Sequence, residues 1–223
     1  MITLGKFFFR TRNWLFPLIA VAIYLLEAPP QTGALREGFA LALMALGVSL
    51  RVLTISRQRI ERDGRGKTAH AQELFTGGMF GVSRNPLYLG NLIAATGFFL
   101  LHGGPLVAFL GIGLFLFIYY CIIFSEEAYL SATFGDEWQA YRADVPRLVP
   151  RLDRLRAILR QGQFDFRKAL ASERNVISLN TVLAAFALWY KASTLQDTAM
   201  PPLSSVVLLV LLVAYLVTIS RRK

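Results

Sequence analysis

The stretch PLVAFLGIGLFLFIYYCIIF, residues 105–124, is twenty residues long and contains no charged side chain. A helix of about 20 mostly apolar residues crosses the hydrocarbon core of a bilayer, because it satisfies its own backbone polar groups there. The stretch therefore predicts a membrane-spanning helix. The whole chain of 223 residues has the same character, since 55% of its residues are hydrophobic and its mean hydropathy is +0.48. Such a composition is too apolar for a soluble domain.

Five further apolar segments lie on the two sides of this stretch, at 14–28, 35–55, 87–101, 176–190 and 203–219. Segments 87–101 and 176–190 are short, so we expect their interfacial flanks to complete the crossing. The first segment is not followed by a convincing small-residue cleavage site, which favours a membrane helix over a signal peptide. We therefore predict an all-α fold, a polytopic transmembrane bundle of about six spans.

Lysine and arginine side chains gather in four places along the chain. These are Lys6, Arg10 and Arg12; Arg57, Arg59, Arg62, Arg65 and Lys67; the long run from Arg142 to Arg174; and Arg221, Arg222 and Lys223. Because cationic loops resist translocation, this pattern predicts that both termini are cytoplasmic, at the cell inner membrane if the source is bacterial. The net charge of +10 then follows from topology and from attraction to membrane lipids, and we expect no nucleic-acid partner.

Cysteine and histidine are scarce in this sequence. Cys121 is the single cysteine and lies inside an apolar segment, so no disulfide framework is possible. The two histidines, His70 and His102, are far apart in the sequence, and we predict no metal site.

A glycine-rich segment, TGGMFGVSRNPLYLG at 76–90, leads into the third apolar segment. Asn85 is a residue type that caps helices through its side-chain oxygen, and Pro86 suits the first helical position. A helix that begins here presents free backbone N–H groups, and with Arg84 beside them the helix start is expected to hold a carboxylate or phosphate.

A second polar motif follows the fourth apolar segment. Ser125 is expected to cap a new cytoplasmic helix, with Glu126 and Glu127 in its favourable first turn. Both carboxylates lie at the membrane boundary, where an uncompensated charge is costly, so we expect a cationic partner. Beyond them, an aromatic-rich element over 134–142 ends near two prolines, Pro146 and Pro150.

These features divide the chain into four parts. Residues 1–60 are expected to form an N-terminal transmembrane hairpin, and 61–150 a core of two spans with cytoplasmic motifs. Residues 151–174 have the basic, amphipathic pattern of a helix on the cytoplasmic leaflet, and 175–223 form a C-terminal transmembrane hairpin.

The motifs SRNPLYLGN at 83–91 and SEEAYLSATFGDEWQAYRADVPRLVP at 125–150 resemble those of the isoprenylcysteine carboxyl methyltransferase and phospholipid methyltransferase superfamily. In that superfamily GxYxxxRHPxYxG is followed by EExxLxxxFGxxYxxYxxxVPRxxP. The resemblance covers roughly residues 65–150. It implies a cytoplasmic pocket for S-adenosylmethionine at the membrane face and a lipophilic small molecule or lipid as the methyl acceptor.

Carried over position by position, the resemblance implies a cofactor pocket formed by helical segments on the cytoplasmic side. Its residues would be Gln72, Phe75, Phe80, Arg84, Asn85, Pro86, Leu87, Tyr88, Gly90, Glu126, Glu127, Tyr141 and Arg147. The cofactor needs an anion-binding helix end, an acidic partner and an aromatic wall, and these residues can supply all three. No catalytic residue is assigned, because methyl transfer from an activated donor depends mainly on positioning, here by Arg84 and Glu126.

Two positions depart from the superfamily pattern. The RHP histidine is Asn85 here, which excludes proton relay at that position. An arginine that in the prenylcysteine enzymes helps to bind the substrate carboxylate is Ile122 here. The second difference favours a less anionic acceptor, such as a lipid amine, a thiol or a small amphiphile.

Two alternatives to the methyltransferase remain open at this point. An NADPH-dependent membrane reductase of the sterol or enone type also carries an RHP-like motif, of the form RHPNYxGE. Leu87 and Asn91 stand in place of its Asn and Glu, which weakens that case. The other alternative is a non-catalytic membrane protein that retains the fold.

Overall fold

The computed structural model of the chain describes residues 1–56, 74–161 and 164–195. All regular secondary structure within these ranges is helical, which confirms the predicted all-α class. The elements are α1 (Ile2–Tyr24), α2 (Ala34–Ser56), the 3-10 helix η1 (Gly78–Gly81), α3 (Pro86–His102), α4 (Pro105–Asp144), α5 (Leu152–Gln161) and α6 (Phe166–Leu195).

Among the described helices, α2, α4 and α6 are long and apolar enough to cross a membrane, and α3 is a shorter apolar helix. Helix α1 begins at Ile2, well before the predicted start of its span at residue 14, so its first half carries basic side chains. The predicted span 203–219 lies outside the described residues. The bundle is consistent with the predicted polytopic fold.

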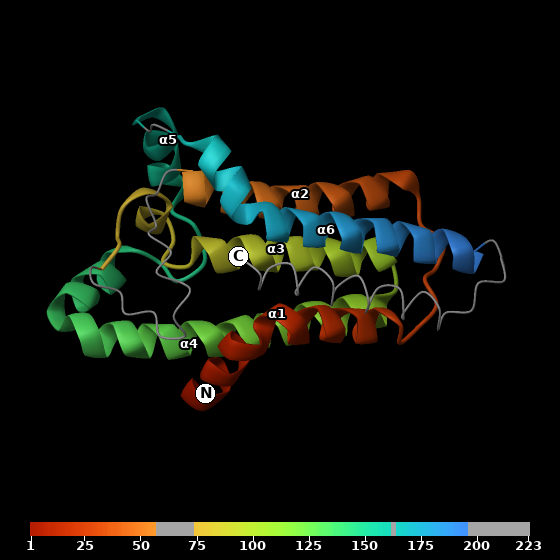
Figure 1. Cartoon of the computed structure of the whole chain (residues 1–223), viewed down its shortest axis with the longest axis horizontal. Helices are drawn as coiled ribbons and strands as arrows, with labels where there is room; N and C mark the ends of the chain where they lie inside the picture. The colour runs from red at the N-terminus through yellow and green to blue at the C-terminus, as the bar shows by residue number, and fades with distance from the viewer. Residues whose placement is uncertain (57–73, 162–163, 196–223) are drawn as a thin grey trace.

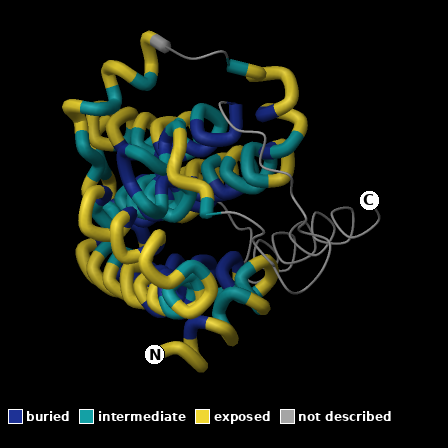
Figure 2. Tube along the Cα trace, turned by 90° about the vertical axis from the view of Figure 1, so that its left-hand side faces the viewer, coloured by how far each residue is buried: buried dark blue, intermediate teal, exposed yellow. Residues whose placement is uncertain are grey.

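The helices run side by side along the long axis of the molecule, and α3 lies among α2, α4 and α6 (Figure 1). Helix α1 packs on α4, and α2 also packs on α6. Buried residues face the inside of this arrangement and exposed residues face outward (Figure 2). Figure 1 also shows that η1, the start of α3 and the last turns of α4 meet at one end of the bundle, which we call the motif end.

Close packing of α2 on α3 depends on glycine. A Cβ atom on Gly90 would lie 2.7 Å from both the Arg51 Cγ atom and the Gly47 carbonyl oxygen, and a Cβ on Gly47 would lie 2.4 Å from the Gly90 oxygen. Small residues let helix backbones approach closely, as they commonly do in membrane proteins. Gly90 therefore contributes to helix packing, whereas its predicted part in cofactor binding stays a prediction.

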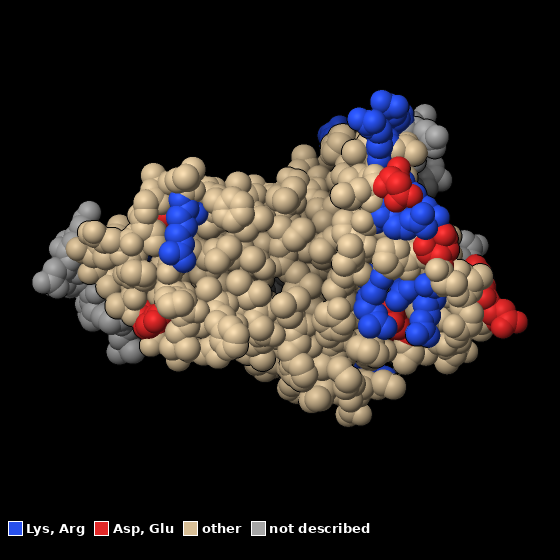
Figure 3. All heavy atoms as spheres, turned by 180° about the vertical axis from the view of Figure 1, so that it is seen from behind, with Lys and Arg blue, Asp and Glu red and all other residues tan. Residues whose placement is uncertain are grey.

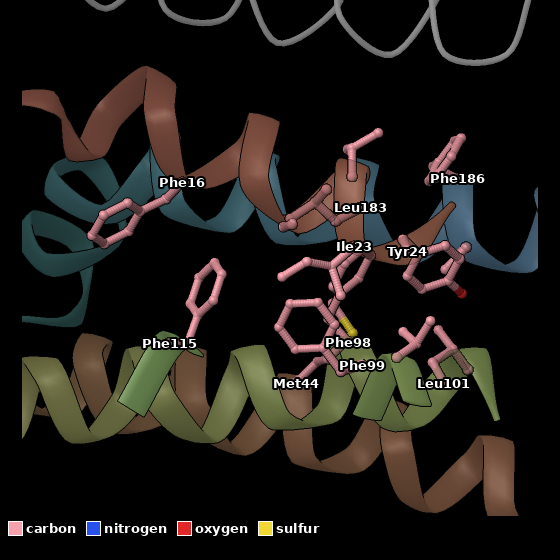
Figure 4. Packing of buried hydrophobic residues seen from close by; sticks show 14 of the residues in the cluster. Phe16, Ile23, Tyr24, Met44, Phe98, Phe99, Leu101, Phe115, Leu183 and Phe186 are labelled. Carbon is pink, nitrogen blue, oxygen red and sulfur yellow. The ribbon is translucent and has the colours of Figure 1, made fainter. Parts of the chain in front are cut away.

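Aromatic side chains fill the interior between the helices (Figure 4). Phe16 of α1 meets Phe115 and Tyr119 of α4 edge to face, with ring centroids 5.6 and 5.5 Å apart. Tyr24 stacks on Phe98 of α3 at 4.7 Å. Such contacts add about 0.5–1.5 kcal/mol per pair beyond the burial of area.

Charged side chains are absent from the middle of the face in Figure 3 and gather toward the two ends, mostly at the end where α5 projects. An apolar belt between two polar ends is what a bilayer requires of a spanning protein. At the end opposite the motif end, Lys191 pairs with Glu37 at 2.8 Å and also donates to the Thr32 hydroxyl, and Arg36 donates to the Gly103 carbonyl at 2.9 Å. The Lys191–Glu37 pair ties α6 to α2, and the Arg36 hydrogen bond ties α2 to the end of α3.

Two helix boundaries differ from the prediction. Ser125 does not cap a new helix, because α4 continues from Pro105 to Asp144 and only changes direction at Gly135, where φ is +49°. The predicted leaflet segment 151–174 is divided, since α5 ends at Gln161 and residues from Phe166 on already belong to α6. In both places the fall in hydropathy marks the end of the apolar surface. At Ser125 the backbone stays helical across that point, and after α5 it resumes as the longer helix α6.

Candidate functional site

Main-chain hydrogen bonds bring the two sequence motifs together at the motif end. The Arg84 N–H donates to the Pro146 carbonyl at 2.9 Å, and the Arg151 N–H donates to the Val82 carbonyl at the same distance. The Ser83 hydroxyl and the Asn85 side-chain amide both donate to the Arg147 carbonyl, at 3.2 and 3.1 Å. The segment before α3 is therefore fixed to the segment that follows α4.

Asn85 does not cap α3 as predicted. Its residue position is the N-cap and Pro86 is the first helical residue, as expected, but the Asn85 side chain makes no capping hydrogen bond because its amide is turned to Arg147. In the described part of the chain, no side chain accepts a hydrogen bond from the first turn of α3. The helix start therefore retains backbone N–H groups that can bind an anion.

Glu127 joins two arginines from different segments. Its Oε1 accepts from Arg84 Nη2 at 3.0 Å and Nε at 3.1 Å, and its Oε2 accepts from Arg147 Nη2 at 2.7 Å. The predicted cationic partner of the double glutamate is thus present for Glu127. The hydrogen bond to Glu127 raises the pKa of Arg147 above its ordinary value, so this guanidinium stays charged. We call Arg84, Glu127 and Arg147 the arginine clasp.

The remaining donors of Arg84 are directed at the end of α4. Its Nη1 donates to the carbonyl groups of Arg142 and Val145 at 2.9 and 2.7 Å. Each nitrogen of the guanidinium thus has a partner within the protein, and only 7% of the side chain is exposed. Arg84 was predicted to bind an anionic ligand together with the helix start, but its anion in the structure is Glu127. This geometry gives Arg84 a positioning role.

The turn at Gly135 folds the end of α4 over η1. Trp138, Tyr141 and Val145 form a small apolar cluster with Leu74, Leu130 and Phe134. The Tyr141 hydroxyl donates to the Phe80 carbonyl at 2.8 Å, which fixes η1. Phe80 in turn meets Phe75 edge to face, with ring centroids 5.7 Å apart, and Phe75 is 47% exposed. These two rings can form the aromatic wall that the sequence predicts for adenine. The predicted pocket residue Gln72 lies outside the described residues.

Tyr88 and Glu126 form a second polar contact beside the clasp. The Tyr88 hydroxyl donates to Glu126 Oε1 at 2.7 Å, and Arg12 Nη1 of helix α1 lies 3.4 Å from the same hydroxyl oxygen. Glu126 has no ion pair with a residue that the structure describes. Tyr88 belongs to the first turn of α3, so this hydrogen bond joins Glu126 of α4 to the helix that starts at Pro86.

A buried ion pair, which the sequence analysis missed, supports α3 from behind. Arg51 of α2 pairs with Glu173 of α6 at 2.6 Å, and both side chains are at most 9% exposed. Arg51 Nη1 also donates to the Leu87 carbonyl at 3.3 Å and to the Asn91 side chain at 3.0 Å. This network fixes the first two turns of α3. The signal for it was present, since Arg51 lies in an apolar segment and such a charge requires a partner.

The described groups suit the chemistry of S-adenosylmethionine. The free N–H groups at the start of α3 match its carboxylate, the Glu126 carboxylate matches an ammonium or ribose hydroxyl, and the rings of Phe75 and Phe80 match adenine. No group of three histidine, cysteine, aspartate or glutamate side chains within the described ranges could hold a metal ion.

A helical bundle with an apolar belt and a polar site at one end defines an integral membrane protein. Residues 35–137, a little under half of the chain, match the family model described as phospholipid methyltransferase. This match confirms the resemblance to the superfamily of membrane methyltransferases and includes Arg84, Asn85, Tyr88, Glu126 and Glu127. Searches of curated proteins and of solved structures found no match.

Proposed function

We propose that the protein is an integral membrane methyltransferase that uses S-adenosylmethionine and methylates a lipophilic acceptor delivered from the bilayer. The family match supports a membrane methyltransferase in general. The observation that carries the finer proposal is the arginine clasp, because it joins the two motifs and leaves Glu126 and the start of α3 side by side.

In this proposal, Glu126 contacts the cofactor directly, and the first-turn N–H groups of α3 at Leu87 and Tyr88 bind its carboxylate. The rings of Phe75 and Phe80 contact the adenine, and the residues named next act by positioning these groups. The arginine clasp and Tyr141 hold the surrounding segments in place, Pro86 begins the helix, and Asn85 fixes the approach to it. No side chain is needed to activate the donor, because the cofactor supplies a sulfonium whose methyl group is already electrophilic. The protein then contributes alignment and exclusion of water.

The acceptor class follows from the position of the site at the end of the apolar belt. Helices α3 and α4, which carry Tyr88 and Glu126, are apolar along the rest of their predicted spans. Ile122, one turn before Glu126, is fully buried and supplies no cation for an acceptor carboxylate. A lipid amine, a thiol or a small amphiphile suits such a site better than a carboxylate.

The orientation in the membrane belongs to the same proposal. A soluble cofactor must reach the motif end from the cytoplasm, and the sequence pattern puts the basic residues of α5 and of the segment 57–73 on that side. With six spans, both termini would be cytoplasmic. Accessibility of cysteines introduced at Arg10→Cys and Arg36→Cys to a membrane-impermeant reagent would test this, because the two positions should label from opposite sides.

Transfer of a tritiated methyl group from S-adenosylmethionine into a lipid extract tests the activity. We expect label in the lipid fraction with the intact protein, and its loss in Glu126→Gln. Glu137→Gln is the matched control, because Glu137 is an exposed glutamate on the same helix with no side-chain bond to the site. Calorimetry with S-adenosylmethionine and S-adenosylhomocysteine would refute the proposal if neither ligand bound. NADPH consumption with the same extract would point to the reductase instead, which no comparison supports.

A further inference from the structure

Helix α5 lies beside the bundle at the motif end and is turned across the direction of the long helices (Figure 1). Its basic side chains project from the surface at that end (Figure 3). The helix is attached at two points. The N–H of Arg151, just before the helix, donates to the Val82 carbonyl, and the Ile158 Cδ1 atom in the second turn approaches the Cβ position of Gly81 at 3.9 Å. One face of α5 therefore contacts η1, and the other face is open.

The arginines of this region fall into two groups. Arg151 and Arg154 are engaged within the protein, since Arg154 makes two hydrogen bonds of 2.6 Å with Asp144 and Arg151 pairs with Asp153 at 3.1 Å. Arg156 and Arg160 are exposed and make no ion pair or hydrogen bond through their side chains with any residue that the structure describes. Their charge is thus directed away from the protein.

Two leucines share the open face with these arginines. Leu152 is 67% exposed and Leu159 is 44% exposed. Residue 156 lies four positions after 152, and residues 159 and 160 lie three and four positions after 156, so the four side chains form one stripe along the helix. Exposed leucine beside unpaired arginine is the composition of a helix that lies in the bilayer interface.

We propose that this stripe is a docking surface for anionic lipid headgroups. The leucine side chains enter the boundary between headgroups and acyl chains, and Arg156 and Arg160 contact lipid phosphates. The charge complementarity commits the site to an anionic surface, because zwitterionic lipid offers no net attraction to two guanidinium groups. At about 1 kcal/mol per basic residue near an anionic surface, neutralising both arginines should lower the preference of α5 for anionic lipid roughly 30-fold.

A fluorophore on an introduced cysteine tests the docking directly in lipid nanodiscs. The native Cys121 is fully buried, so labelling is selective for the new site. Leu159→Cys reports the proposed lipid face, and Ala157→Cys on the opposite side of α5 is the matched control. With phosphatidylglycerol present in phosphatidylcholine discs, nitroxides near the headgroup should quench the label at 159 strongly and the label at 157 weakly.

The role of charge is tested in the same discs. Arg156→Gln with Arg160→Gln should bring the quenching at 159 close to that at 157, whereas Arg156→Lys with Arg160→Lys should retain it. Equal quenching at the two positions would overturn the proposal. So would strong quenching at 159 that is unchanged in pure phosphatidylcholine or in the double glutamine variant, because either result would show docking without anionic attraction. These measurements do not depend on methyl transfer.

Discussion

Replacing Glu127 by alanine removes the shared anion of the arginine clasp, and we expect a large loss of stability. The Arg84 side chain is only 7% exposed, so the substitution leaves a charge with little access to water. Removing one partner of a buried ion pair costs about 3–5 kcal/mol. Arg147 is 26% exposed and can regain water, so Arg147→Ala should cost less, about 1–3 kcal/mol for its charge-assisted hydrogen bonds.

The double substitution Arg84→Met with Glu127→Leu distinguishes the cost of an unpaired buried charge from a general sensitivity of the site to substitution. It removes both charges of the Arg84–Glu127 pair and keeps apolar volume. The carbonyl groups of Arg142 and Val145 lose a donor, and Arg147, which is 26% exposed, loses its carboxylate partner but can regain water. We expect a loss of about 1–3 kcal/mol, which is smaller than that of Glu127→Ala alone. The losses of the single substitutions Arg84→Met and Glu127→Leu should therefore be strongly non-additive in the double variant.

Unfolding in detergent micelles, followed by tryptophan fluorescence, measures these free energies. Trp138 is a suitable local probe, because its ring lies 5.7 Å from the Arg84 guanidinium carbon. Asp136→Ala, at an exposed position of the same helix, should change the free energy of unfolding by less than about 0.5 kcal/mol. The reasoning would be refuted if Glu127→Ala cost no more than Asp136→Ala, or if the double variant lost the sum of the two single losses.

Three further predictions concern α3, two on its packing and one on ligand binding at its first turn. Arg51→Ala should cost about 3–5 kcal/mol of unfolding free energy, because it removes one partner of a buried ion pair. A double variant Arg51→Met with Glu173→Leu should recover part of that loss in the same assay. Gly90→Ala should lower the free energy of unfolding by about 1–3 kcal/mol, because the new Cβ clashes with α2. Gly113→Ala is the control, since no atom lies within 4 Å of its new Cβ, and it should leave the unfolding midpoint unchanged or slightly raised. Tyr88→Phe should weaken calorimetric binding of S-adenosylhomocysteine by roughly tenfold or more through loss of its charge-assisted hydrogen bond, while an unchanged affinity would exclude this tyrosine from the site.

Proline residues and the ends of apolar segments predicted the helix boundaries well where the chain turns sharply. The predicted segments 35–55 and 87–101 became Ala34–Ser56 and Pro86–His102, and Pro86 and Pro105 each begin a helix as expected. The prediction failed at Ser125, because hydropathy reports the solvent around a helix and not the continuity of its backbone. A helix that leaves the bilayer need not end there.

The sequence predicted that the glutamates of the site have cationic partners, but not which residues those partners are. A carboxylate at the membrane boundary requires a cation, and this argument correctly anticipated a partner for the double glutamate. It could not select Arg84 and Arg147, which lie on either side of Glu127 in the sequence. The turn at Gly135 brings Arg147 back to Glu127, and the packing of α3 on α4 brings Arg84 to it. The Arg51–Glu173 pair joins residues 122 positions apart, and no local pattern relates them.

The structure explains why two adjacent glutamates can serve different purposes. Successive residues on a helix point in directions about 100° apart, so one carboxylate faces the arginine clasp and the other faces Tyr88. The charge of Glu127 is compensated by two guanidinium groups, whereas Glu126 has a hydroxyl as its close partner and no ion pair within the described residues. A carboxylate without an ion pair at the end of an apolar belt is costly, and a cationic ligand would reduce that cost. Of the two glutamates, we therefore infer that Glu126 is the one that binds the cofactor.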